Sequence, residues 1–229
     1  MVDRVPHDFA SPGVLRWGLV GSFISGGQTI YGETQERRTD GGGAWQASFQ
    51  SIPILTTADA RAWEAMMLRF HLGDTKVIVP RCAGRMKADF SRPAAFVPHS
   101  DETPFSDEMP YASALLAGSL SSDISLRATI ATIVLEPGYA LVGGESFTMT
   151  GPKYGDRLYG VASVLSQSGG VATVRFGPPA REAYAAGTVV DFADPRCVMR
   201  AQLADGADWG DYDTAWHAST SIVFRETFR

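Results

Sequence analysis

Short stretches in which apolar and polar residues alternate one by one recur along most of this chain, and they restrict its fold more than any other feature. The alternation is clearest where Trp45, Ala47 and Phe49 interleave with glutamine and serine. A period of two residues places the apolar side chains on one face of a β-strand. The same reasoning predicts strands over 15–23, 28–38, 76–82, 124–134, 147–150, 158–166, 171–176, 188–192, 197–201 and 219–228. Strands that do not alternate with helices indicate a mainly antiparallel β fold.

One segment has the spacing of a helix instead. Its apolar residues recur at intervals of three or four and form a single stripe: Ala60, Trp63, Met67 and Phe70. Thr56 is a suitable N-cap, and Asp59 lies near the positive end of the helix dipole. Gly73 fits the position just after the C-terminus. The sequence therefore predicts one α-helix at about 57–72.

The predicted strands fall into two groups along the chain. Residues 1–85 and 193–229 are expected to form one discontinuous β-sandwich or barrel domain that carries the helix. Residues 124–192 are expected to form a smaller inserted β domain, in which Ser168-Gly169-Gly170 fits a hairpin turn. Between them, 86–123 contains four prolines and no clear periodicity. Such a segment predicts an irregular arm that is functional or held by a neighbour, or else an ordinary surface loop.

The charge distribution argues against tight binding of nucleic acid. The 229 residues carry 20 basic and 25 acidic side chains, a net charge of −5, and the stretches 99–110 and 205–213 contain acids without bases. No lysine and arginine cluster is present to neutralise phosphates. Residues 1–12 lack the apolar core of a signal peptide, and no run of 18 apolar residues predicts a membrane-spanning helix.

Residues that carry chemistry are few and scattered. The histidines are far apart and do not have the spacing of metal ligands: His7, His71, His99 and His217. Cys82 and Cys197 are expected to be buried thiols in a reducing cytoplasm, although a bridge between them stays open. The sequence predicts no catalytic residue, no cofactor-binding residue and no metal ligand.

Two weaker interpretations concern the loop near the C-terminus. Four carboxylates there could gather around Ca²⁺, but their spacing is not that of a known calcium loop, and a solvated acidic loop is the simpler interpretation: Asp205, Asp208, Asp211 and Asp213. Three aromatic residues beside them could stack on a sugar, although such residues more often anchor a loop or pack at a subunit contact: Trp209, Tyr212 and Trp216.

Several blocks of sequence resemble tail-tip proteins of long-tailed, siphovirus-like bacteriophages. The blocks of the second half are 157–161, 169–176, 178–181 and 192–200. In the first half, the succession of 43–49, the helix at 59–70 and 76–80 is similar to the ring-forming domain of distal tail proteins. The resemblance covers about 14–82 and 124–203, and 86–123 has no counterpart in it.

The resemblance implies a structural virion protein of the tail tip, or baseplate, without catalytic residues. Members of that family form rings, commonly homohexamers, that join the tail tube protein to the hub and receptor-binding proteins. The chain is then expected to assemble in the bacterial cytoplasm and to reside in the virion. An edge strand at 28–38 could continue a sheet into the next copy. The acidic excess suits a lumen through which DNA slides without sticking.

Two alternatives remain from the sequence. In the first, 124–192 or the loop with Trp209, Tyr212 and Trp216 makes the chain a glycan-binding module that recognises a host surface sugar. In the second, which is the least favoured, Cys82 or Cys197 serves a cysteine hydrolase. The copy number, the host and the receptor stay open at this point.

Overall fold

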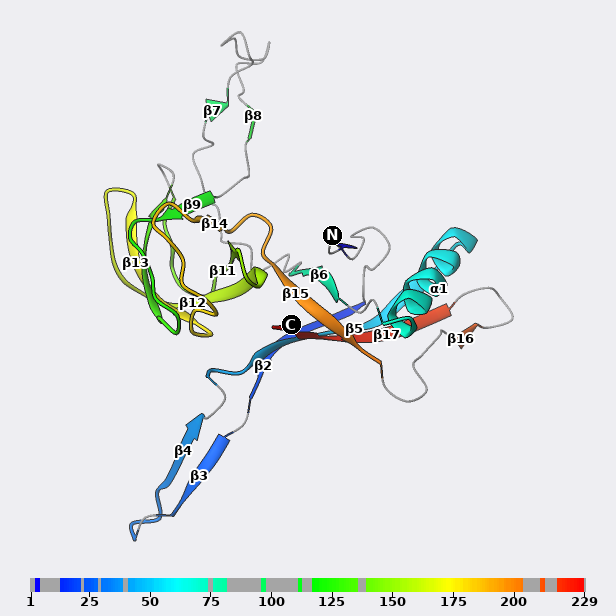
Figure 1. Ribbon diagram of the computed structural model, residues 1–229, viewed down its shortest axis with the longest axis horizontal. Coiled ribbons are helices and arrows are strands. Elements are labelled where there is room, and N and C mark those ends of the chain that lie inside the picture. Colours follow the sequence, from blue (N-terminus) through cyan, green and yellow to red (C-terminus); the bar gives the residue numbers. More distant parts are fainter. Residues whose placement is uncertain are drawn as a thin grey trace. The chain divides into compact units, whose positions relative to one another are not determined.

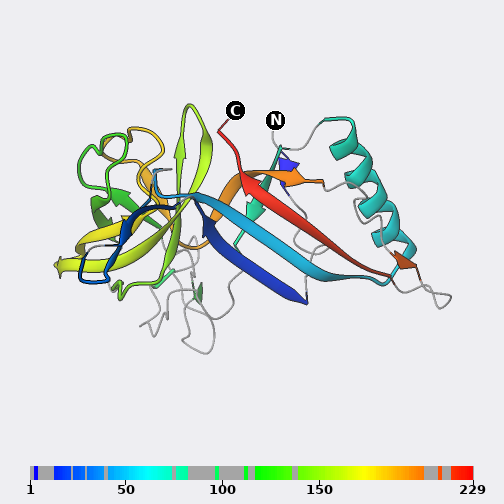
Figure 2. The same ribbon diagram turned by 90° about the horizontal axis from the view of Figure 1, so that it is seen from below.

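The computed structural model is mainly β, with antiparallel strands and one helix, and it confirms the predicted fold class (Figures 1 and 2). It describes residues 3–4, 13–21, 23–28, 30–38, 41–73, 76–81, 96–97, 111–112, 117–135, 139–203, 211–212 and 218–228. Contacts divide the chain into a sheet unit, Met1–Arg81 with Arg196–Arg229, and a barrel unit, Cys82–Pro195. That the two parts fold as separate domains stays a prediction.

The sheet unit is built on a seven-stranded sheet with the order β1-β6-β15-β17-β5-β2, in which β16 also pairs with β17. Its strands are β1 (Asp3–Arg4), β2 (Val14–Val20), β5 (Ala44–Ile54), β6 (Lys76–Pro80), β15 (Arg196–Gln202), β16 (Asp211–Tyr212) and β17 (Ala218–Glu226). Neighbours are antiparallel except for β1 and β6. Because β15 and β17 lie between β6 and β5, the C-terminal segment completes a sheet that the N-terminal segment begins.

Helix α1 (Thr57–His71) begins and ends where the sequence predicts. The side-chain oxygen of Thr56 accepts a hydrogen bond from the N–H of Asp59 at 3.1 Å. In return, the carboxylate of Asp59 accepts one from the N–H of Thr56 at 3.0 Å. Gly73 follows the helix with a φ of +99°, a left-handed conformation that glycine adopts without strain. The capping box and the glycine therefore fix both ends.

The apolar stripe of α1 faces the core of the sheet unit. Its buried residues are Trp63, Met67 and Phe70, while Ala60 is half-buried. The ring of Phe70 meets Phe224 of β17 edge-on, with 6.4 Å between centroids, and Phe224 meets Phe49 of β5 at 5.5 Å. The predicted alternation in β5 is confirmed, because Trp45, Ala47 and Phe49 are all buried.

The barrel unit contains a closed barrel with the strand order β10-β13-β12-β11-β14-β9. Its strands are β9 (Ala117–Leu120), β10 (Ile130–Leu135), β11 (Ser146–Gly151), β12 (Gly155–Ser168), β13 (Val171–Gly177) and β14 (Val189–Asp191). The predicted turn joins β12 to β13, with φ values of +58° at Gly169 and +78° at Gly170. Two positive φ values in a two-residue turn match the twist of an antiparallel hairpin.

Aromatic rings fill the centre of the barrel. Phe147 of β11 is almost fully buried, and its centroid lies 5.6 Å from Tyr159, 5.9 Å from Phe176 and 5.3 Å from Phe192. These rings come from three different strands and the segment after β14, so they tie the closed sheet together from inside.

The predicted strand at 28–38 is correct only over Thr34–Arg38. The chain instead forms a hairpin of β3 (Phe23–Gln28) and β4 (Thr34–Arg38), which pair antiparallel with each other. Gly27 and Gly32 have φ values of +83° and +81°, so the backbone turns between the two strands. Ile30 and Tyr31, whose residue types favour strands, lie in this turn.

The predicted strand at 124–134 and the irregular arm at 86–123 also need correction. The strand begins only at 130, because Arg127 takes a φ of +69° and Ile124 makes an isolated bridge to Tyr184. The arm does not extend to 123, because β9 closes the barrel between β10 and β14. Within the arm, β7 (Phe96–Val97) pairs with β8 (Tyr111–Ala112). The remaining residues of 86–116 lie outside the described residues.

Candidate functional site

Most of the side chains singled out from the sequence lie outside the described residues: His7, Cys82, His99, Asp205, Asp208, Trp209, Asp213, Trp216 and His217. Asp211 and Tyr212 are described only as the backbone of β16. The calcium and sugar interpretations, the hydrolase and the Cys82–Cys197 bridge therefore stay untested. Within the described ranges, no group of three or more histidine, cysteine, aspartate or glutamate side chains is placed to hold a metal ion.

Two of the predicted candidates are described, and the structure does not bring them together. Cys197 is fully buried in β15 opposite Val79 of β6, with its thiol 3.6 Å from the carbonyl oxygen of Val198. His71 is the last residue of α1 and is exposed.

The barrel contains a buried pair of tyrosines. The hydroxyl oxygens of Tyr159 and Tyr184 lie 3.0 Å apart. The backbone N–H of Arg181 donates a hydrogen bond to the hydroxyl of Tyr159 at 3.0 Å. Burial, reinforced by the neighbouring Tyr159, raises the pKa of Tyr184 far above its usual value. Tyr184 therefore keeps its proton, and the two hydroxyls act as internal hydrogen-bonding groups.

Buried acids of the barrel unit hold loop backbones. The carboxylate of Glu145 accepts hydrogen bonds from the N–H groups of Val142, at 2.6 Å, and Gly143, at 2.8 Å. The carboxylate of Glu182 accepts from the N–H groups of Lys153, at 3.2 Å, and Tyr154, at 3.3 Å. The turn at Lys153 and Tyr154 has one more hydrogen bond. The buried guanidinium of Arg157 donates it to the carbonyl of Tyr154 at 2.6 Å. These charges serve as structural anchors.

A substitution at Gly151 tests this anchoring. A Cβ atom there would overlap the carboxylate of Glu182. We expect Gly151→Ala to displace the carboxylate from the two N–H groups and to lower the free energy of unfolding by about 1–3 kcal/mol. Urea unfolding followed by fluorescence measures the change.

The matched control for Gly151 lies in the neighbouring strand. A Cβ atom on Gly160 would meet carbonyl oxygens at 3.8 and 3.9 Å, which is ordinary contact. Gly160→Ala should therefore change the free energy of unfolding by less than about 1 kcal/mol. In a Glu182→Ala background the cost of Gly151→Ala should largely disappear, and an undiminished cost in that background would show that the carboxylate is not the cause.

A cation packs among aromatic rings inside the sheet unit. The guanidinium carbon of Arg81 lies 5.2 Å from the ring centroid of Trp45 and 6.0 Å from that of Trp17. The two indoles meet edge-on at 6.2 Å. Burial lowers the pKa of Arg81, but a guanidinium keeps its proton in proteins, so the interaction is cation–π. Sequence analysis missed this cluster because its three residues are far apart in the chain.

The sheet has an open edge at β2. This strand is the last in the strand order, and within the described part of the chain its pairing partner is β5 alone. It contains no proline, and its residues are alternately exposed and half-buried along all seven positions. An edge of this length offers a row of backbone N–H and C=O groups to another strand.

A second exposed feature is the hairpin tip, defined as Ile30 and Tyr31. Ile30 is 95% exposed and Tyr31 is 86% exposed, between β3 and β4. Large apolar side chains this exposed are typical of a contact surface when they occur together. In the sequence, the sign of this tip is that two large apolar residues lie between Gly27 and Gly32. The sequence instead predicted a strand there.

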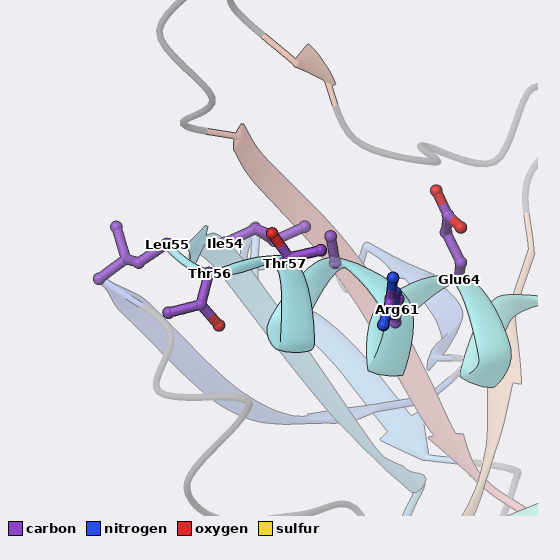
Figure 3. A pocket seen from close by; sticks show the side chains of 7 residues that line it. Ile54, Leu55, Thr56, Thr57, Arg61 and Glu64 are labelled. Atoms are coloured by element: carbon purple, nitrogen blue, oxygen red, sulfur yellow. The ribbon is translucent and has the colours of Figure 1, made fainter.

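The third feature is a groove where β5 passes into α1, which we call the helix groove (Figure 3). It has a volume of about 420 Å³ and is lined by Ile54, Leu55, Thr56, Thr57, Ala60, Arg61 and Glu64. Ile54 is buried, whereas Leu55 is 63% exposed. The groove thus combines an apolar wall with charged side chains on its helix side.

No protein-family model matches the chain, and a search of curated proteins finds no match. In the part of the chain that the structure describes, no helix has the length and the apolar character that crossing a membrane requires.

Proposed function

We propose that this chain is a structural subunit of a phage tail tip, which joins copies of itself into a ring between the tail tube and the hub. The observation that carries the proposal is the open edge of β2, the dark blue strand at the margin of the sheet in Figure 2. Proteins that work as monomers protect such edges with proline, bulges or covering segments. In β2 the register with β5 is continuous from Val14 to Val20, so the outer edge is regular enough to receive a strand.

A ring follows if β2 meets a different surface on the next copy. A heterologous contact of this kind closes when the rotation per copy divides a full turn, and about six copies match the ring-forming proteins that the sequence resembles. The ring would contact the tube protein on one side and the hub or receptor-binding proteins on the other. It would reside in the virion, with DNA passing through its lumen.

The buried charges of the barrel unit fit a structural role. Glu145, Glu182 and Arg157 all bind loop backbone, which fixes the shape of the loops. A subunit that presents surfaces to its neighbours needs loops of fixed shape. This function makes and breaks no covalent bond.

A lysine in the middle of β2 tests the proposal. A Cβ atom on Gly18 would have no atom within 4 Å, so the variant Gly18→Lys can fold without a clash. Natural proteins place lysines on edge strands to discourage pairing with another chain. We expect the wild-type chain to sediment as a ring of about six copies at high concentration and Gly18→Lys to remain a monomer.

The control lysine replaces Ser219 in β17. Ser219 is also exposed, but it already pairs with β5 on one side and β16 on the other. Ser219→Lys should assemble like the wild type, and thermal unfolding should show that both variants are folded. Equal assembly of Gly18→Lys and wild type would remove β2 from the contact, and a wild type that never assembles would reject the proposed function.

A further inference from the structure

Arg81 is a half-buried cation that has no acidic partner among the described residues. Its guanidinium contacts the rings of Trp17 and Trp45, and no hydrogen bond or ion pair joins it to another described side chain. Burial lowers its pKa, and no carboxylate of the described ranges offsets that effect. A cation–π contact uses the face of a guanidinium and leaves the N–H groups in its plane available.

We call Trp17, Trp45 and Arg81 the arginine–indole cluster. Besides the guanidinium, it contains the indole N–H of Trp17, which is buried and has no acceptor in the part of the chain that the structure describes. The side chains of the cluster therefore offer hydrogen-bond donors and no acceptor. Donors of this kind, with a positive charge among them, select a negatively charged acceptor.

The cluster lies beside the open edge of β2. Trp17 is in the middle of that strand and pairs with Ala47 of β5, so it shares a sheet face with Trp45, two residues before Ala47. Arg81 directly follows β6, and β15 and β17 lie between β6 and β5 in the strand order. The Arg81 side chain therefore reaches the indoles across the face of the sheet.

A strand that pairs with β2 would place a side chain next to the cluster. The residue opposite Trp17 would lie on the same face, with its Cβ about 5 Å from that of Trp17. An apolar residue there would bury Arg81 further without an acceptor, which costs free energy. A carboxylate there can take two parallel hydrogen bonds from the guanidinium. The residues on either side face Leu15 and Leu19, which are half-buried, so apolar side chains fit there.

Building on the proposed function, we propose that the strand of the next copy which pairs with β2 carries an aspartate or glutamate opposite Trp17, and that its carboxylate binds Arg81. The open edge provides backbone pairing, which any strand can satisfy. The carboxylate adds the selection of one strand and one register, because a shifted strand would leave the cation without its partner.

Two synthetic strands test the chemistry of the site on the full-length protein, kept dilute so that it is monomeric. One is Thr-Val-Thr-Glu-Thr-Val-Thr, which matches the seven residues of β2, and the other has Gln in place of Glu. Tryptophan fluorescence reports binding, because two indoles form the cluster. We expect the Glu strand to bind wild type about tenfold more tightly than the Gln strand.

The variants assign that preference to Arg81. Arg81→Gln should abolish it, and Arg81→Lys, which keeps the charge without the planar fork, should reduce it. The matched control is Arg16→Gln, because Arg16 is exposed on the opposite face of β2 and should not affect the preference. Equal binding of the two strands to wild type, binding of neither, or a preference that survives Arg81→Gln would overturn the inference.

Acetate and inorganic phosphate distinguish a strand-borne carboxylate from a free anion. Each should bind far more weakly than the Glu strand, because neither gains backbone pairing along β2. Phosphate that binds through Arg81 more tightly than the Glu strand would show a site for a free anion and would also overturn the inference.

Assembly separates this inference from the proposed function. Arg81→Gln should raise the concentration for half-assembly by about tenfold, while Arg16→Gln should not change it, and thermal unfolding checks that both variants are folded. Rings that form equally well with folded Arg81→Gln would overturn the carboxylate contact and leave the ring intact. A wild type that prefers the Glu strand but never forms rings would keep the binding site and reject the proposed function.

Discussion

Replacing Phe147 by alanine is expected to lower the stability of the barrel by about 3–5 kcal/mol. Phe147 is almost fully buried and touches the rings of Tyr159, Phe176 and Phe192 at 5.3–5.9 Å between centroids. The substitution leaves a cavity where the strands of the closed barrel meet, and the rings around it lose their common contact. Hydrogen exchange measured by mass spectrometry in the full-length chain reports the loss peptide by peptide.

The barrel peptides should lose protection in Phe147→Ala, while the peptides of β5, β17 and α1 should keep theirs. A control in the same unit is Val142→Ala, since Val142 is 82% exposed, and this change should cost less than about 0.5 kcal/mol. Loss of protection throughout the chain would show that the two units unfold together, against the division that the contacts indicate.

Trp63→Ala should have the second large effect, again about 3–5 kcal/mol, but in the sheet unit. Trp63 is fully buried and lies on the face of α1 that also carries Met67 and Phe70. Without the indole, the helix loses much of the contact that holds it against the sheet. The same exchange measurement should show faster exchange in α1, β5 and β17.

The control for Trp63 is on the same helix. Leu68 is more than half exposed, so Leu68→Ala should change the stability of the sheet unit by less than about 0.5 kcal/mol. If both variants destabilised the unit equally, the buried stripe would not be what holds α1 in place.

The two core variants should also differ in assembly. The open edge of β2, the hairpin tip and the helix groove all belong to the sheet unit. Trp63→Ala should therefore weaken ring formation, whereas Phe147→Ala should leave it largely unchanged. Under the proposed function, the barrel unit would then be left to contact the other parts of the tail tip.

Local patterns were sufficient to predict several of the regular elements. The period-two alternation identified β5, and the two glycines identified the turn between β12 and β13, because each signal lies within a few neighbouring residues. The ends of α1 were equally local, since Thr56, Asp59 and Gly73 determine them. Predicting these elements requires no information about the rest of the chain.

Features that depend on distant contacts were missed. β9 contains small residues, and Gly118 is needed because a Cβ atom would lie 2.9 Å from both a side-chain carbon of Ile133 and the carbonyl oxygen of Val134. That requirement comes from β10 and is invisible in the local pattern. At 124–129 the alternation resembles a strand, but Arg127 turns the chain and Leu126 is left exposed.

The candidate surfaces were only partly predictable. Among the described strands, β2 has a long free edge because of its place in the sheet order, which no local pattern determines. The hairpin tip was hidden because isoleucine and tyrosine favour strands. The helix groove is contiguous in sequence, but its hollow arises from the way β5 turns into α1.

The central claim is that copies of this chain fit against one another and form a closed ring. Negative-stain electron microscopy of the full-length protein at high concentration tests it most directly. The account predicts ring-shaped class averages with a central lumen, which the Gly18→Lys variant does not form. Particles of single-copy size at every concentration, in the wild type as in the variant, would contradict it.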